Sequence, residues 1–161
     1  CALAPRAGRV PSSTHQWLLV WAARRMMKDG FIVSGFDGRA PRGNEWSALP
    51  NPFNINGVRP DAWGQRASDQ TIAFAEAKTF RDVDTAHTRQ QLDILGNVRL
   101  KATKAVCPIY IAVPRSAVYE LDRVLIDVGL LRAQHLVRLH IPDVFVEDPL
   151  HGSSQALRTP A

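Results

Sequence analysis

The residues of this chain whose types and spacing are best suited to chemistry lie between Pro60 and Lys78. Asp61 follows Pro60 directly, and Glu76 comes fifteen positions later. Side chains on a strand alternate between its two faces, so Glu76 and Lys78 point the same way if they end a strand. The polar residues 64–69 are typical of a turn, which would fold the apolar run before Glu76 back onto the segment carrying Asp61.

Such a hairpin would bring two carboxylates and one ammonium group into one small volume. Two carboxylates this close repel each other unless a cation lies between them, and carboxylate oxygens are ligands that suit Mg²⁺ or Mn²⁺. Lys78 could then orient an attacking water and offset the charge that builds on a phosphate. The pattern therefore favours metal-dependent chemistry on a phosphate ester.

The paired motifs Pro60-Asp61 and Glu76-Ala77-Lys78 resemble the signature of the PD-(D/E)xK nuclease superfamily, whose members include restriction endonucleases and archaeal-type Holliday junction resolvases. The resemblance implies a Mg²⁺- or Mn²⁺-dependent deoxyribonuclease. It makes Asp61 and Glu76 metal ligands, with the main-chain carbonyl of Ala77 as a third. Lys78 becomes the group that positions water or stabilises charge.

Two further positions follow from this resemblance. Many members bring a Gln or Lys from the helix after the ExK strand to the active site, and Gln91 matches that position, with Gln90 as the alternative. Many also carry an acid on the first helix, but residues 14–28 contain no Asp or Glu. His15, Gln16 or Glu45 could stand in its place, or the position is missing, so we expect one metal rather than two.

Hydrophobic periodicity and turn residues predict the elements that must hold these groups. We expect helices over 14–28, 84–98 and 116–129, and strands over 31–36, 58–63, 71–78, 104–113 and 135–140, with a short further piece at 144–146. Three consecutive strands indicate an antiparallel meander, and a strand reached through a helix usually pairs parallel. The prediction is an α/β domain with a mixed sheet flanked by helices. The resemblance implies a restriction-endonuclease-like αβββαβ core, here with an added C-terminal helix and strand.

Length and composition fit this organisation. A chain of 161 residues is long enough for one domain, which we place at residues 14–147, between a flexible basic arm at 1–13 and a flexible tail at 148–161. No apolar stretch approaches the length of a membrane span. The two cysteines, Cys1 and Cys107, give no disulfide framework, which favours a reducing, cytoplasmic location.

A net charge of +5 and a pI of about 9.8 favour a polyanionic partner, and the resemblance makes that partner DNA. The candidate DNA contacts are Arg42, Trp46, Arg81, Arg89 and Lys101. The basic residues among them could neutralise phosphates, or they could form an ordinary solvated face. Trp46 could stack on a base, or it could be a buried lid residue.

We therefore expect a DNA nuclease, and the small size with no added specificity domain indicates a structure-directed endonuclease. By analogy with junction resolvases, we expect a homodimer. One alternative is a DNA-binding or assembly subunit with the same fold and no cleavage activity. Others are a restriction-type endonuclease, and an unrelated α/β domain in which Asp61 is a turn residue and Glu76 and Lys78 end a solvated strand.

Overall fold

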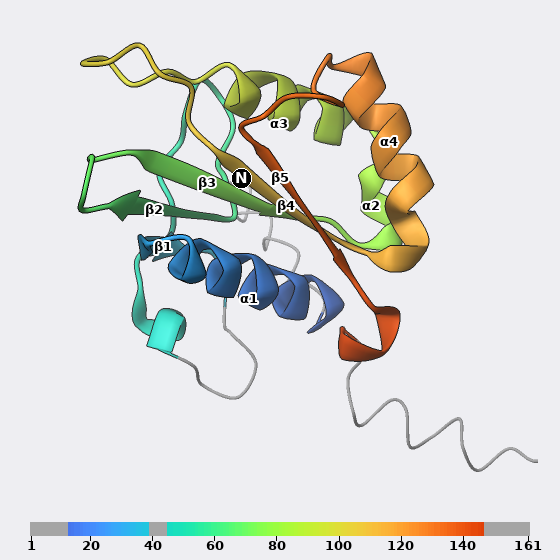
Figure 1. Cartoon of the computed structure of the whole chain (residues 1–161). Coiled ribbons are helices and arrows are strands. Elements are labelled where there is room, and N and C mark those ends of the chain that lie inside the picture. The colour runs from blue at the N-terminus through green and yellow to red at the C-terminus, as the bar shows by residue number, and fades with distance from the viewer. Residues whose placement is uncertain (1–12, 39–44, 147–161) are drawn as a thin grey trace, which may run out of the picture.

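One five-stranded mixed sheet organises the molecule, and helices cover both of its faces (Figure 1). The computed structural model describes residues 13–38 and 45–146. The strands, in their order across the sheet, are β1 (Phe31–Phe36), β2 (Ala62–Arg66), β3 (Ile72–Ala77), β4 (Ile109–Pro114) and β5 (Leu136–Ile141). The first three pair antiparallel, and β3, β4 and β5 pair parallel. These pairings confirm the predicted α/β class, the meander and the mixed sheet.

Helix α1 (Ser13–Lys28) packs on one face of the sheet, mainly over β3 and β4. Its apolar positions recur at helical spacing and are fully or almost fully buried, and they include Leu18, Leu19, Ala22, Ala23 and Met26. The facing side of β3 consists of three buried alanines, Ala73, Ala75 and Ala77. Small side chains there let the helix lie close to the strand. The first turn of α1 is thereby held near the C-terminal end of β3.

The opposite face of the sheet is covered by α2 (Phe80–Val83), α3 (Ala86–Gly96) and α4 (Val118–Asp127) (Figure 1). Thr85 caps α3, because its side chain accepts a hydrogen bond of 3.0 Å from the main-chain N–H of Thr88. Phe74 of β3 and alternate residues of β4 bury their side chains on this face, together with Leu92 and Leu95 of α3. Alternation along β3 therefore assigns Glu76 to the same face as Phe74.

Several predicted boundaries were wrong. The strand expected at 58–63 is β2, which begins at Ala62; Pro60 lacks an N–H group for the ladder and lies before the strand. The strand expected to begin at Lys104 begins at Ile109, because Lys104 directly follows a turn and has a positive φ of 61°. The piece expected at 144–146 is part of a 3-10 turn, η3 (Asp143–Phe145).

Short turns and one short helix connect the main elements. Two further 3-10 turns are η1 (Glu45–Ala48) and η2 (Arg115–Ala117). The short helix α2 was not predicted. Within the described residues, no helix combines the length and apolar character needed to cross a membrane. The predicted arm at 1–13, apart from Ser13, and the predicted tail at 148–161 lie outside the described residues.

Candidate active site

The β2–β3 hairpin places Asp61 beside the end of β3, as the sequence predicted. The main-chain N–H of Asp61 donates to the carbonyl of Ala75 over 3.0 Å, and Ala62 is paired with Ala75 in the ladder. One carboxylate oxygen of Asp61, Oδ2, accepts a hydrogen bond of 2.8 Å from the main-chain N–H of Ala77. The acid is therefore fixed against the Glu76-Ala77-Lys78 segment by main-chain geometry.

Glu76, Lys78 and Gln91 meet on the face of the sheet that carries α3. Lys78 Nζ lies 3.7 Å from Glu76 Oε2 and donates a short hydrogen bond to Gln91 Oε1. All three side chains are buried, and Glu76 is fully so. Gln90, the alternative to Gln91, is exposed on α3. We call Asp61, Glu76, Lys78 and Gln91 the acid–lysine cluster.

The two carboxyl groups of the cluster have opposite electrostatic environments. Burial raises the pKa of Glu76 well above its ordinary value, and the charge of Asp61 adds to this effect, with Lys78 opposing it only in part. Burial would also raise the pKa of Asp61. However, the hydrogen bond from His15 and the charges of His15 and Lys78 outweigh that effect, so the pKa of Asp61 is lowered. Divergent pKa values of neighbouring acids are typical of functional sites.

The first turn of α1 supplies two polar neighbours to Asp61. His15 Nε2 lies 3.2 Å from Asp61 Oδ2, and burial, which lowers the pKa of His15, is outweighed by this contact, so the pKa is raised. Gln16 is buried, with its Nε2 at 3.4 Å from His15 Nδ1. Of the three substitutes that the sequence offered for a first-helix acid, His15 is therefore the one in contact with Asp61. Glu45 instead lines a separate pocket.

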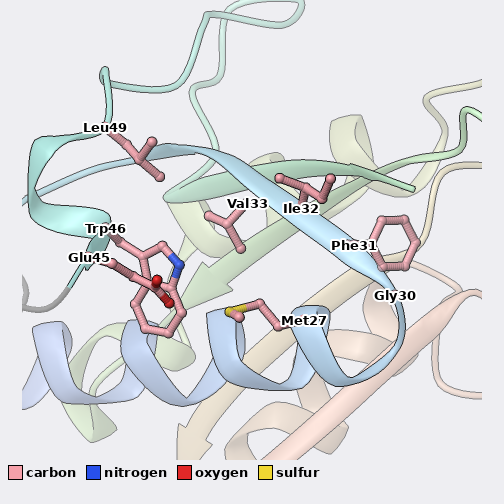
Figure 2. A pocket seen from close by; sticks show the side chains of 8 residues that line it. All are labelled: Met27, Gly30, Phe31, Ile32, Val33, Glu45, Trp46 and Leu49. Carbon is pink, nitrogen blue, oxygen red and sulfur yellow. The ribbon is translucent and has the colours of Figure 1, made fainter. Parts of the chain in front are cut away.

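That pocket, about 390 Å³ in volume, lies between α1, β1 and η1 (Figure 2). It is lined by Met27, Gly30, Phe31, Ile32, Val33, Glu45, Trp46 and Leu49. The lining is largely apolar, and none of the acid–lysine cluster belongs to it. The pocket therefore has no direct part in chemistry at Asp61 and Glu76.

The structure separates the predicted DNA contacts into three kinds. Arg81 is exposed on α2, directly after the cluster's strand. Lys101 is also exposed, but it precedes β4, and the parallel pairing of β3 with β4 places it at the other end of the strands from Lys78. Arg89 is engaged in ion pairs of 2.8 Å with both Asp84 and Asp127, which compensate its charge.

Trp46 corresponds to the buried alternative and not to an exposed stacking surface. Only 6% of it is exposed, and its ring stacks on Phe36 with centroids 6.0 Å apart. This burial favours the buried interpretation of Trp46, and contact of the ring with DNA stays a prediction. Arg42 lies outside the described residues.

Arg115 is a basic residue near the cluster that the sequence analysis missed. It is exposed in η2, just after β4, and η2 packs beside α2. The sequence could have indicated this position of Arg115, because parallel pairing of β3 with β4 brings the segments after both strands to the same edge of the sheet. No ion pair is recorded for Arg81 or Arg115 among the described residues.

A cation fits the donor set of the cluster. In the described residues, no group of three or more His, Cys, Asp or Glu side chains is arranged to hold a metal ion. The site in question is of another kind, with two carboxylates and the carbonyl of Ala77. Both carboxylate oxygens of Glu76 are buried without a hydrogen-bond partner, as is Gln16 Oε1. Buried acceptors without donors are costly and often bind an ion or a water molecule, and oxygen ligands of this type suit Mg²⁺ or Mn²⁺.

Comparison of the chain with family models, with curated proteins and with solved structures found no match in any of the three. Function is therefore inferred from the geometry of the site.

Gln91 gives a first testable consequence. Replacing Gln91 by alanine removes the acceptor that holds Lys78 Nζ, so we expect about a tenfold lower cleavage rate, from misplacement of the ammonium group. The exposed neighbour Gln90 provides a matched control, and Gln90→Ala should cut DNA at the wild-type rate. Single-turnover rates at saturating metal make the comparison. Equal rates for the two variants would remove Gln91 from the site.

Proposed function

We propose that this chain is a metal-dependent nuclease of the PD-(D/E)xK type, which hydrolyses DNA phosphodiester bonds. The observation that carries the proposal is the meeting of Asp61, Glu76 and Lys78 at the end of β3, with both oxygens of buried Glu76 lacking a hydrogen-bond partner. The order of α1, three strands, α3 and β4, with only the short α2 intervening, supports a restriction-endonuclease-like core. A structure-directed endonuclease is the form that we favour, and the predicted homodimer stays a prediction.

Each residue of the acid–lysine cluster has a separate role in this proposal. Asp61 Oδ1, both oxygens of Glu76 and the carbonyl of Ala77 would hold the Mg²⁺ or Mn²⁺. When bound, that ion would supply positive charge to stabilise the phosphate oxygens and the leaving oxygen. Lys78 positions the attacking water through Nζ, and Gln91 holds that ammonium group in place. Main-chain support for Asp61 keeps this arrangement fixed before the substrate arrives, which lowers the cost of reaching the transition state.

A second candidate function is supported by the contact between His15 and Asp61. An imidazole that is already paired with a carboxylate reduces the need of that carboxylate for a cation. The chain would then be a DNA-binding or assembly subunit whose partner does the cutting.

One panel of assays separates the two candidates. The full chain is incubated with linear duplex, single-stranded, flap and four-way-junction DNA in Mg²⁺, in Mn²⁺ and in EDTA. The nuclease proposal predicts cleavage of at least one DNA with metal and none in EDTA. Retention of DNA in a gel-shift assay, without cleavage under any of these conditions, would contradict it and favour the second candidate.

The location of Arg81 predicts its contribution to DNA binding. Reversing its charge, as Arg81→Glu, should weaken binding and lower the dependence of log K on log salt concentration by about 1, because one phosphate contact is lost. Lys101→Glu makes the same change of charge at the far end of the strands and serves as the control. Binding titrations at several salt concentrations measure both. An equal loss in the two variants would show that DNA does not lie specifically at the α2 end of the sheet.

A further inference from the structure

Two donors converge on the same oxygen of Asp61. Oδ2 accepts from the N–H of Ala77 over 2.8 Å and is contacted by His15 Nε2 over 3.2 Å. Within the described part of the chain, both hydrogen bonds to this carboxylate involve Oδ2, and none involves the other oxygen, Oδ1. One donor belongs to the rigid main chain of β3, and the other belongs to the first turn of α1. Together they fix the carboxylate plane so that Oδ1 is the oxygen left for a ligand.

His15 is itself held by its neighbour. Gln16 places Nε2 at 3.4 Å from His15 Nδ1, so a neutral imidazole that accepts there carries its proton on Nε2 and donates it to Asp61, and a protonated imidazole donates to Asp61 through the same atom. The Gln16 amide has little freedom, because it is 6% exposed and lies tightly against Gly38. A Cβ atom added at Gly38 would lie 2.5 Å from both the nitrogen and the oxygen of that amide. Close contacts therefore link Gly38 to Gln16, Gln16 to His15, and His15 to Asp61.

We propose that His15 is a positioning residue for the metal ligand Asp61, and that it acts by holding Oδ2 so that Oδ1 faces the cation. This inference depends on the proposed function, because it assumes that the acid–lysine cluster takes a divalent ion. It gives the first helix a role that needs no acid of its own: His15 orients a ligand. Hydrogen-bonding partners of metal ligands typically contribute 10- to 100-fold to metal affinity.

The test compares side chains that keep or lose the donor at similar size. Glutamine can place an N–H group near the position of the imidazole Nε2, whereas leucine fills space without a donor. We expect His15→Leu to bind Mn²⁺ 10- to 100-fold more weakly than the wild type, as measured by calorimetry on the full chain. His15→Gln should recover most of that loss. Thr14→Ala, in the same turn, is the matched control and should bind as the wild type does.

Each outcome decides a different question. Should the wild type bind no Mn²⁺ and cut no DNA, the proposed function fails, and this inference fails with it. Should the wild type bind and cut while His15→Leu binds Mn²⁺ as tightly, the function stands and the positioning role is overturned. An equally large loss in His15→Gln and His15→Leu would also overturn it, because the donor would then not be what matters. Circular dichroism melting checks that each variant folds, and His15→Ala repeats the comparison if the leucine does not fit.

Discussion

Lys78→Met is expected to lower the rate of DNA cleavage by about 100- to 1,000-fold while leaving DNA binding largely intact. Methionine keeps the apolar stem but removes the ammonium group, which lies 3.7 Å from Glu76 Oε2 and is held by Gln91. Loss of one preorganised charge or donor at the reacting centre typically has an effect of this size on kcat. The measurement is a single-turnover rate at saturating Mn²⁺, with the binding constant for the same DNA determined separately in EDTA.

The control for this experiment is Lys101→Met, which makes the same change on an exposed turn at the far end of β3 and β4. It should cleave at the wild-type rate. Asp61→Ala should abolish cutting as well, because it removes a proposed ligand. If Lys78→Met cut within about threefold of the wild type, the ammonium group would have no part in the chemistry, and the acid–lysine cluster would lose its main functional interpretation.

The second large effect concerns stability, because Glu76 is expected to destabilise the metal-free protein. Its carboxyl group is fully buried, neither oxygen has a hydrogen-bond partner, and burial together with Asp61 raises its pKa. In EDTA near pH 8, Glu76→Gln should therefore raise the free energy of unfolding by about 1–3 kcal/mol, because the amide, unlike the carboxyl group, has no charged form that burial disfavours. Thermal or urea unfolding measures this difference.

The direction of the pH dependence follows from the raised pKa. At a pH below the ordinary value for a glutamic acid, Glu76 is protonated in both the folded and the unfolded chain and contributes nothing. As pH rises above that value, the unfolded chain loses the proton first, so the folded state binds more protons and the free energy of unfolding falls. The stability advantage of Glu76→Gln should accordingly be small near pH 4 and should grow toward neutral pH. If the stability advantage of Glu76→Gln instead shrank as pH rose, the raised pKa of Glu76 in the folded protein would be contradicted.

In EDTA, Glu76→Gln is expected to be more stable than the wild type, and divalent metal should reverse this order of stability. A ligand present at 100 times its dissociation constant stabilises the folded state by about 2.7 kcal/mol, and only the wild type keeps both carboxylates to bind it. Wild-type protein should therefore gain more from Mn²⁺ than Glu76→Gln does. Asp93→Asn, which neutralises an exposed carboxylate on α3, is the control and should change the free energy of unfolding by less than about 0.5 kcal/mol. Equal gains in wild type and Glu76→Gln would exclude Glu76 as a ligand.

The acid–lysine cluster was predictable from the sequence because local rules determine it. Alternation along β3 assigns Glu76 and Lys78 to one face, and a polar turn of the right length returns Asp61 to that strand. Gln91, the position that the resemblance implied, is buried on α3 beside Lys78, and its role in cleavage stays a prediction. Each of these inferences needs only one or two neighbouring elements.

What could not be predicted depends on packing between distant segments. Trp46 is buried against Phe36, and nothing in the sequence around it distinguishes that position from an exposed loop. Arg89 is engaged by Asp127 on another helix, a pairing set by how α3 and α4 cross. The contact between His15 and Asp61 likewise requires knowing that α1 packs with its first turn at the end of β3. Residues of this kind show their role only when the tertiary structure is known.

The most direct test of the central claim is crystallography of the full chain with Mn²⁺, with the metal located by its anomalous scattering. A metal-dependent nuclease built on this cluster predicts one strong peak in contact with Asp61 Oδ1 and the carboxylate of Glu76, at ligand distances of roughly 2.0–2.6 Å. Crystals that hold Mn²⁺ elsewhere, or none between these two acids at millimolar concentration, would contradict the account.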